Sequence, residues 1–421
     1  MSLQASTSAT YKPLTLWGVI GSLYVTQGIP MGVAFGALPA IFRHENHSTE
    51  TIGLLGLVML PWALKFLWAP FVDRHFGGTY QRRRQLIIPA QVLQAIILFT
   101  IGLWPHENAI GGPVIALLVF ANLVSATQDI ATDGLAIEII PKGKMGWVNS
   151  AQIGGFTLGM LLGDSIAIAL YDSGGWLLCF CILSLTTLLT LIPICLHKDI
   201  NPLSDTTSSV KTTKKASLRR LFKRQDAYYI ISIAATFYFA RAMSGSMTSP
   251  FLVDIGLTLN TIALITGIGI TCITLISSGV GGFLVNKKGA TYVAICAGYL
   301  AVFSLFLWLI PAYFQITDVF TIVTIVLVNG IVSGIAYVAF FSLFMQWASN
   351  EQAGTDFSFL QSSETTTNIV AAMVGGVTAG ALGFSGNFLV ASVVGLIIMV
   401  WITFVLIKIN VTSQEKRSPE F

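Results

Sequence analysis

The groups best placed to do chemistry in this sequence are a few ionisable residues that interrupt long apolar stretches. They are Lys65, Asp129, Asp133, Glu138, Asp164, Arg241 and Glu364. A charge at the centre of a membrane-spanning helix costs about 2.5 to 3.5 kcal/mol, so such groups usually face a cavity or a partner. We therefore expect these side chains to border a route for a solute or a proton.

Two of the carboxylates, Asp129 and Asp133, are four residues apart and would lie on one face of a helix. Unpaired, they would repel each other, and a nearby cation would relieve the repulsion. Lys65 is expected at a depth similar to that of Asp133 and is the candidate partner. Two interpretations stay open: an ion pair that fixes the packing of two helices, or a carboxylate that binds and releases a coupling proton. Glu364 is a candidate for proton coupling or for cytoplasmic gating.

Arg241 lies near the middle of its apolar stretch. Its planar guanidinium suits a carboxylate or another anionic group of a substrate, so we favour substrate binding over a purely structural role. Polar and aromatic residues on other apolar stretches would complete the pocket, although each could instead satisfy an ordinary hydrogen bond between helices. They are Tyr24, Gln27, Gln128, Tyr238 and Tyr337.

The apolar stretches that carry these residues predict an all-α integral membrane protein. Of the 421 residues, 54% are hydrophobic and 10% are charged, against roughly 25% charged in soluble domains. A spanning helix needs about 20 mostly apolar residues. We predict twelve such spans, at residues 14–42, 50–71, 86–104, 113–139, 146–171, 175–196, 226–254, 260–285, 290–311, 318–347, 355–381 and 385–409.

The distribution of basic residues predicts the orientation, because Lys and Arg concentrate in cytoplasmic loops. Most of the 23 Lys and Arg residues fall on the side of the two chain ends. Both termini and a linker at residues 197–225 are therefore expected in the cytoplasm. The net charge of +4 reflects this topology and predicts no nucleic-acid partner.

Metal and enzyme chemistry have little support in the sequence. The five cysteines fall inside predicted spans without a CxxC pair, and the five histidines lie in loops or at helix ends. No HExxH motif and no loop that would cradle a phosphate is present. We expect no catalytic residue, no metal and no cofactor, and a membrane-embedded enzyme is a remote alternative.

An internal repeat suggests two related six-helix halves, residues 1–196 and 226–421. Residues 51–55 (TIGLL) open the second span and residues 261–265 (TIALI) open the eighth, about 210 residues later. Two halves of the same orientation, related by a pseudo-two-fold axis, are the plan of the major facilitator superfamily, whose substrate site lies between the halves.

Two motifs carry a more specific resemblance. Residues 60–74 (LPWALKFLWAPFVDR), followed by arginines at 82–84, resemble the motif of the branch that contains AmpG muropeptide permeases and acetyl-CoA transporters. Residues 126–136 (ATQDIATDGLA) match that branch's span 4 motif, and their ending at 132–136 (TDGLA) looks most like the related RhtX/FptX siderophore transporters. The resemblance implies that Asp73 and Arg74 latch the cytoplasmic ends of the halves. It also places Lys65, Asp129 and Asp133 in the branch's buried polar cluster.

The resemblance further implies a secondary transporter of the cytoplasmic membrane that imports a bulky polar solute by alternating access. We expect a proton-coupled importer of a siderophore or ferric siderophore, with a muropeptide permease as the alternative. The muropeptide permeases often carry further C-terminal spans, and this difference favours the siderophore. The expected partners are a metal chelate or glycopeptide as substrate, protons and membrane lipids, and we expect a monomer.

Overall fold

The computed structural model describes residues 13–44, 54–104, 112–197, 215–258, 261–262 and 264–415. Within these ranges the chain is helical apart from short turns, and no strand occurs. Helices suit an apolar chain in lipid because each satisfies its own backbone N–H and C=O groups. Large apolar side chains cover much of the outside: Ile96, Phe303 and Phe404 are each more than half exposed. Most of the predicted linker, residues 198–214, lies outside the described residues.

The first half of the chain begins with a helix that passes through a short π-helical turn and continues. Its helices are α1 (Pro13–Gly32), η1 (Val33–Ala37), α2 (Leu38–His44), η2 (Leu54–Met59), α4 (Leu60–Leu64), η3 (Lys65–Leu67), α5 (Ala69–Phe76), α6 (Tyr80–Leu103), α7 (Gly112–Ile139), η5 (Lys142–Lys144), α8 (Met145–Leu161), η6 (Leu162–Ile166), α9 (Ala167–Leu189) and α10 (Ile192–Leu196).

The second half begins with two short helices and ends with a very long helical segment. Its helices are α11 (Leu218–Phe222), α12 (Ala227–Ala234), α13 (Phe239–Ser246), α14 (Thr248–Asp254), η7 (Leu264–Gly269), α16 (Ile270–Lys288), α17 (Ala290–Leu305), η8 (Phe306–Trp308), α18 (Leu309–Phe314), α19 (Val319–Trp347) and α20 (Ala353–Glu415).

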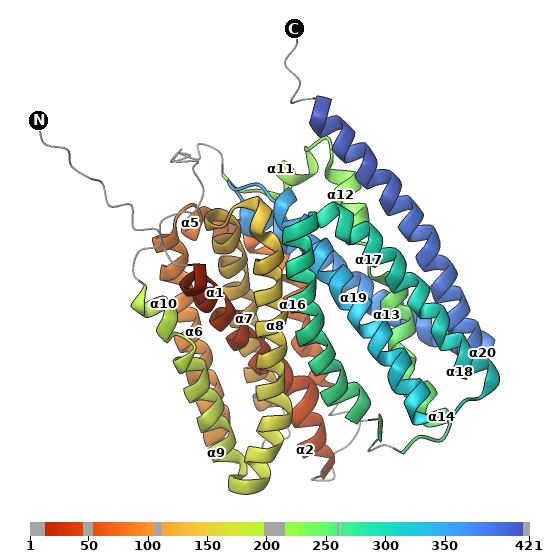
Figure 1. Ribbon diagram of the computed structural model, residues 1–421. Helices are drawn as coiled ribbons and strands as arrows, with labels where there is room; N and C mark the ends of the chain where they lie inside the picture. Colours follow the sequence, from red (N-terminus) through yellow and green to blue (C-terminus); the bar gives the residue numbers. More distant parts are fainter. Residues whose placement is uncertain are drawn as a thin grey trace, which may run out of the picture.

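Eight helices in the described chain are long and apolar enough to cross a membrane, or nine if a pair bent by 57° counts as one span. Two of them, Lys142–Leu196 and Ala353–Ile409, have 55 and 57 residues, well above the roughly 20 that span a bilayer. Each contains a glycine in the left-handed region, Gly175 with φ 75° and Gly383 with φ 73°. Figure 1 shows the chain descending through α8 and returning through α9, so we interpret each long segment as a hairpin of two spans.

The predicted span at residues 226–254 is interrupted. It is divided into α12, α13 and α14, with turns at residues 235–238 and at Met247. Broken membrane helices are typical of transporter binding sites, since the break frees backbone groups beside a cavity. If the bent pair and this broken span each cross the membrane once and each hairpin crosses it twice, the described helices correspond to the twelve predicted spans.

The helices of the two halves meet along two lines. In the first half α8 packs against α1, and on its other side it packs against α16 of the second half. The beginning of α20 packs against α4, α5 and α7. Figure 1 shows α5 and α11 at one end of the bundle and α2 and α14 at the other. We call these the α5–α11 end and the α2–α14 face.

Candidate functional site

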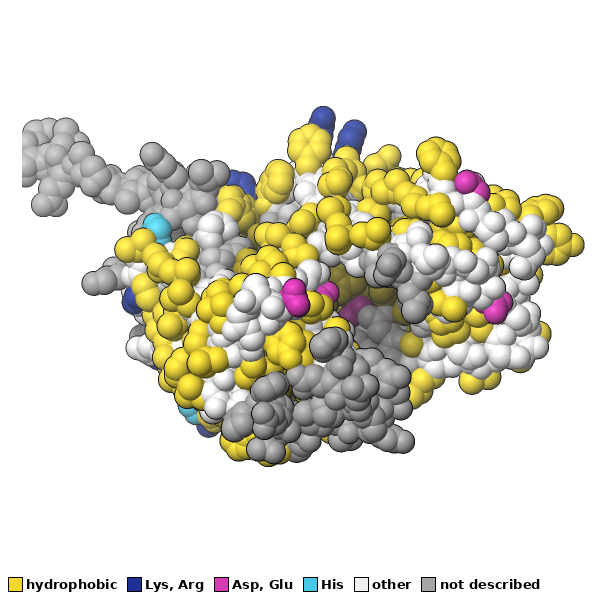
Figure 2. All heavy atoms as spheres, turned by 90° about the horizontal axis from the view of Figure 1, so that it is seen from below, with side chains coloured by type: hydrophobic (Ala, Val, Ile, Leu, Met, Phe, Trp, Pro, Cys, Tyr) yellow, Lys and Arg dark blue, Asp and Glu magenta, His cyan; other side chains and the backbone are white. Residues whose placement is uncertain are grey.

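Two adjoining cavities form what we call the chamber: one of about 560 Å³ lies between the halves, and one of about 420 Å³ is lined by the second half apart from Ile153. Tyr337, Glu364, Asn368 and Ile153 line both cavities, so the cavities meet at these residues. Figure 2 looks onto the α2–α14 face and shows a hollow between two groups of helices, with acidic side chains in and around it. The chamber is therefore reached from this face.

The wall that the first half contributes holds a buried ion pair. Lys65 lies in the 3₁₀ turn η3, where the second span bends, and its ammonium donates to the carboxylate of Asp129 on α7. It also donates to Oε1 of Gln361 on α20, at 2.5 Å, and lies 5.1 Å from the ring centroid of Trp62. Both charged side chains are almost fully buried. The bond to Gln361 means that this pair also joins the two halves.

Asp133, one helical turn beyond Asp129, has a different set of partners. Its Oδ1 accepts a hydrogen bond from the Tyr24 hydroxyl at 2.6 Å and another from Nε2 of Gln152 at 3.1 Å. Its Oδ2 has no hydrogen-bond partner within the described chain. The structure thus pairs the predicted cation Lys65 with Asp129, while Tyr24 and Gln152, which both line the chamber, connect Asp133 to it.

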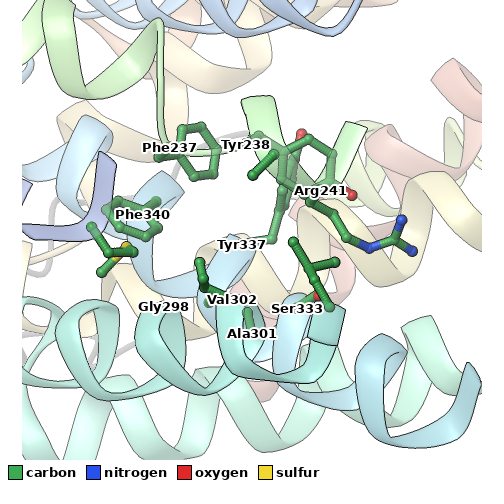
Figure 3. A pocket seen from close by; sticks show the side chains of 13 residues that line it. Phe237, Tyr238, Arg241, Gly298, Ala301, Val302, Ser333, Tyr337 and Phe340 are labelled. Carbon is green, nitrogen blue, oxygen red and sulfur yellow. The ribbon is translucent and has the colours of Figure 1, made fainter. Parts of the chain in front are cut away.

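The second half contributes a cation and an anion that do not pair with each other. Tyr238 contacts Tyr337 edge-on, with 5.2 Å between the ring centroids, and Figure 3 shows both residues beside Arg241. The Tyr337 hydroxyl donates to Oε1 of Glu364 at 3.5 Å, and Asn368 Nδ2 donates to the same oxygen at 2.6 Å. Arg241 lines the cavity of about 420 Å³, and its Nε lacks an acceptor among the described residues.

The two predicted pocket glutamines lie in different places. Gln27 lines the chamber, and its Nε2 donates to Thr132 Oγ1 at 3.4 Å. Gln128 is fully buried and donates to Gln91 Oε1 at 3.3 Å, and it is not among the residues that line the chamber. Gln128 therefore forms a hydrogen bond between α7 and α6, which was the alternative to a role in the pocket.

The α5–α11 end is closed by a polar cluster around Asp73. Its Oδ1 accepts from Arg83 Nη2 at 2.6 Å, and its Oδ2 accepts from both the backbone N–H and the hydroxyl of Thr355, each at 2.6 Å. Arg83 also pairs with Glu138 at 2.6 Å. Asp73 thus connects α5 and α6 of the first half to α20 of the second. Arg74 Nε donates at 2.7 Å to the Ala216 carbonyl oxygen, which precedes α11.

Sequence reasoning did not identify several residues of the site. Gln152, Gln361 and Asn368 each bond to a predicted charged residue, but isolated Gln and Asn residues carry no motif. Arg83 lies in the visible run of three arginines, but only the phase of α6 decides which of the three points inward. Thr355 is the first residue of its predicted span, and no motif in the sequence marks it as part of the site.

The fold and the chamber define a multi-pass membrane protein that transports a solute. A family model described as acetyl-coenzyme A transporter 1 matches residues 18–175, and one described as Major Facilitator Superfamily matches residues 233–421. The two models lie one after the other along the chain. The chain has the major facilitator fold, and its second half is similar in sequence to that superfamily.

Similar proteins of known name extend over nearly the whole chain. The anhydromuropeptide permease of Escherichia coli K12 is 24% identical over 388 residues, which are 89% of this chain and 77% of the permease. A transporter named AmpG 4 from Rickettsia conorii is 23% identical, over 92% of this chain and 96% of its own. The crystal structure of the major facilitator transporter FucP, in its outward conformation, is 16% identical with a TM-score of 0.69, covering 93% of this chain and 98% of FucP. This last likeness concerns the fold alone.

Proposed function

We propose that this protein is a secondary transporter of the inner membrane that moves an anhydromuropeptide or a closely similar cell-wall fragment by alternating access. The observation that carries the proposal is the combination of a polar chamber with similarity to an anhydromuropeptide permease over 89% of this chain. Tyr24, Tyr238, Tyr337 and Trp62 give the chamber aromatic faces beside its charges, as a sugar-containing solute requires.

A siderophore is the second candidate for the substrate. Residues 132–136 (TDGLA) favour it, since this ending of the span 4 motif looks most like the siderophore transporters. The similar proteins reported above favour the muropeptide, and we rank it first for that reason. A chelated metal would travel as part of the solute, because the described residues contain no group of three or more potential metal ligands.

The mechanism that we propose has the two halves, residues 1–196 and 226–421, rocking about the chamber with residues 197–225 as the linker. Lys65, Asp129, Asp133 and Glu364 are the groups proposed to couple this motion to a proton. Protonation of Asp129 would remove the charge that holds Lys65, and Lys65 also bonds to Gln361 of the other half. A proton on this carboxylate would therefore weaken a contact between the halves.

Uptake by proteoliposomes tests the substrate and the coupling together. We expect radiolabelled anhydromuropeptide to accumulate under an imposed proton gradient and a protonophore to abolish the accumulation. Uptake of a ferric siderophore without uptake of anhydromuropeptide would reverse our ranking. Uptake of neither would overturn the proposed substrate.

Substitution of the carboxylates tests their role in coupling. Asp129→Asn and Asp133→Asn are each expected to abolish accumulation against a gradient while leaving exchange of solute across the membrane measurable. Asp172→Asn is the matched control, because Asp172 is exposed and lies outside the chamber and outside the cluster around Asp73. Accumulation at the wild-type level in both Asn variants would remove these carboxylates from the coupling mechanism.

A further inference from the structure

We infer that the chamber selects zwitterionic solutes, with Arg241 binding a carboxylate and Glu364 binding an ammonium group of the same molecule. The inference rests on the proposed function, because it names the chemical class of solute that the transport chamber takes. It gives Glu364, one of the groups proposed above for proton coupling, a further role in binding the solute.

The charged residues that line the chamber divide into two kinds. Lys65 and Asp129 form an ion pair and neutralise each other. Arg241 and Glu364 also line the chamber, and neither forms an ion pair with any described residue. A charge away from water without a counter-charge is unfavourable. Two such charges of opposite sign in one cavity of about 420 Å³ match a ligand that brings both counter-charges.

Arg241 is positioned to meet the negative group. It lies in α13, directly after the break in the seventh span, and is partly buried. Figure 3 shows its guanidinium directed away from the aromatic rings of Phe237 and Phe340. Its buried Nε has no acceptor within the described chain. A guanidinium offers two parallel N–H donors that fit the two oxygens of a carboxylate.

Glu364 is positioned to meet the positive group. The residue is 5% exposed, and among the described residues its carboxylate accepts hydrogen bonds only from neutral donors, which are Asn368, Tyr337 and Thr365. A carboxylate has about four acceptor sites, so it can take a further donor. Asn368 Oδ1 and Ser333 Oγ line the same cavity and have no hydrogen-bond partner among the described residues. An ammonium group has three donors, and Asn368, which already bonds to Glu364, supplies an oxygen acceptor beside the carboxylate, while Ser333 supplies another in the same cavity.

The arrangement keeps the two charges apart. Arg241 is one helical turn from Tyr238, Tyr238 contacts the ring of Tyr337, and the Tyr337 hydroxyl reaches Glu364. Both tyrosines therefore connect the two charged residues through their contacts, and the charged residues make no direct ion pair. We expect a solute whose ammonium and carboxylate are separated by several bonds, as in an oligopeptide stem.

Equilibrium binding to the purified full chain in nanodiscs tests the inference. The probes are the tripeptide L-alanyl-γ-D-glutamyl-meso-diaminopimelate, the same peptide with acetylated amines, and the same peptide with amidated carboxylates. For the wild type we expect each derivative to bind about 10- to 100-fold more weakly than the free peptide, as for the loss of a charged hydrogen bond.

Matched variants assign each charge. In Glu364→Gln the acetylated and free peptides are expected to bind equally, while amidation still weakens binding. In Arg241→Gln the amidated and free peptides are expected to bind equally, while acetylation still weakens binding. Arg82→Gln, which removes an exposed cation outside the chamber, should keep the wild-type pattern. The comparison of derivatives on the wild type needs no variant, so a variant that fails to fold leaves the test intact.

Equal binding of all three peptides to the wild type, or no binding of any, would overturn the inference. Loss of accumulation in Glu364→Gln with the wild-type pattern of peptide binding would assign Glu364 to coupling and also overturn it. Anhydromuropeptide uptake is measured in parallel. Uptake without charge selectivity would leave the proposed function standing alone, and charge-selective peptide binding without uptake would leave only the inference.

Discussion

Lys65 and Asp129 form an ion pair from which water is almost excluded. Removing two charges from water costs several kcal/mol per ion, and the attraction between them repays this only with good geometry and further hydrogen bonds. Gln361 supplies one such bond and the Trp62 ring a cation–π contact. The pair is therefore poor evidence for stability as such, and its link across the halves is the better reason for its presence.

The energetics of this pair predict an asymmetry between single and double substitutions. Lys65→Met should lower the free energy of unfolding by about 3 to 5 kcal/mol, because it leaves Asp129 buried and charged. Lys65→Met combined with Asp129→Leu should recover most of this loss, since no unpaired charge remains, yet it should not restore accumulation of solute. Thermal unfolding in detergent and uptake in proteoliposomes measure the two effects. A double variant as unstable as Lys65→Met would contradict the argument.

The run of arginines at 82–84 shows what sequence can and cannot determine for single residues. The run indicates a cytoplasmic loop, and the resemblance indicates a latch at Asp73. The structure buries Arg83 completely between Asp73 and Glu138 and leaves Arg82 exposed. Which of three identical side chains turns inward depends on the phase of α6 against α7, and composition does not record that phase. Composition likewise does not determine which carboxylate Lys65 meets, because the bend at η3 decides where its ammonium group lies.

At the scale of helices, the predicted ends of the spans agree well with the chain reversals. The gap predicted between residues 171 and 175 ends at Gly175, and the gap between 381 and 385 contains Gly383. Runs of apolar residues define helices because lipid requires internally bonded backbone. The break at residues 235–238 was not predicted. That stretch is as apolar as its surroundings, and its turn depends on neighbouring helices, with Thr367 donating to the Ala235 carbonyl oxygen at 2.8 Å.

The contact between α1 and α8 depends on glycines that face each other. Gly28 and Gly32 of α1 lie against α8 and the following turn η6, where Gly159 lies against α1 and Gly163 lies against α1 and η1. A Cβ on Gly159 would approach the Gly28 Cα to 2.9 Å and the Val25 carbonyl oxygen still more closely. Small residues allow such close approach of helices in membranes, where packing rather than water drives association.

Substitution at this contact has a defined expected cost. Gly159→Ala should lower the free energy of unfolding by about 1 to 3 kcal/mol, because backbone atoms of α1 would have to move away. Gly154→Ala on the same helix is the control. Its Cβ would meet only Ser278 Oγ at 3.5 Å and Leu275 at 3.9 Å. Thermal unfolding of the two variants in detergent provides the comparison, and equal stability would argue against a tight α1–α8 contact.

The molecule as a whole is closed at its α5–α11 end and hollowed on its α2–α14 face (Figure 2). Contacts between the halves at the closed end include Asp73 with Thr355 and Lys142 Nζ with the Gln346 carbonyl oxygen at 2.7 Å. On the predicted orientation the closed end is cytoplasmic, and the structure is then an outward-facing state. Alternating access requires these contacts to break while the halves approach each other on the opposite face.

A larger side chain at the closed end should therefore shift the equilibrium away from the outward-facing state. Gly354 lies at the start of α20, and a side chain there would come within 2.8 Å of Asp73 Oδ1 and 2.7 Å of the Ile130 carbonyl oxygen. Gly354→Val should thus push α20 away from α5 and α7 and open this end. Gly380→Val, further along α20, is the control because no described residue lies within 4 Å of its Cβ position.

Spin labels on cysteines at the exposed positions Arg82 and Lys287, with the native cysteines replaced, report the separation of the halves at this end. Pulsed electron paramagnetic resonance should show longer distances in Gly354→Val than in Gly380→Val, which should match the parent. Identical distance distributions in the two variants would show that the contact at Gly354 does not hold the closed end together.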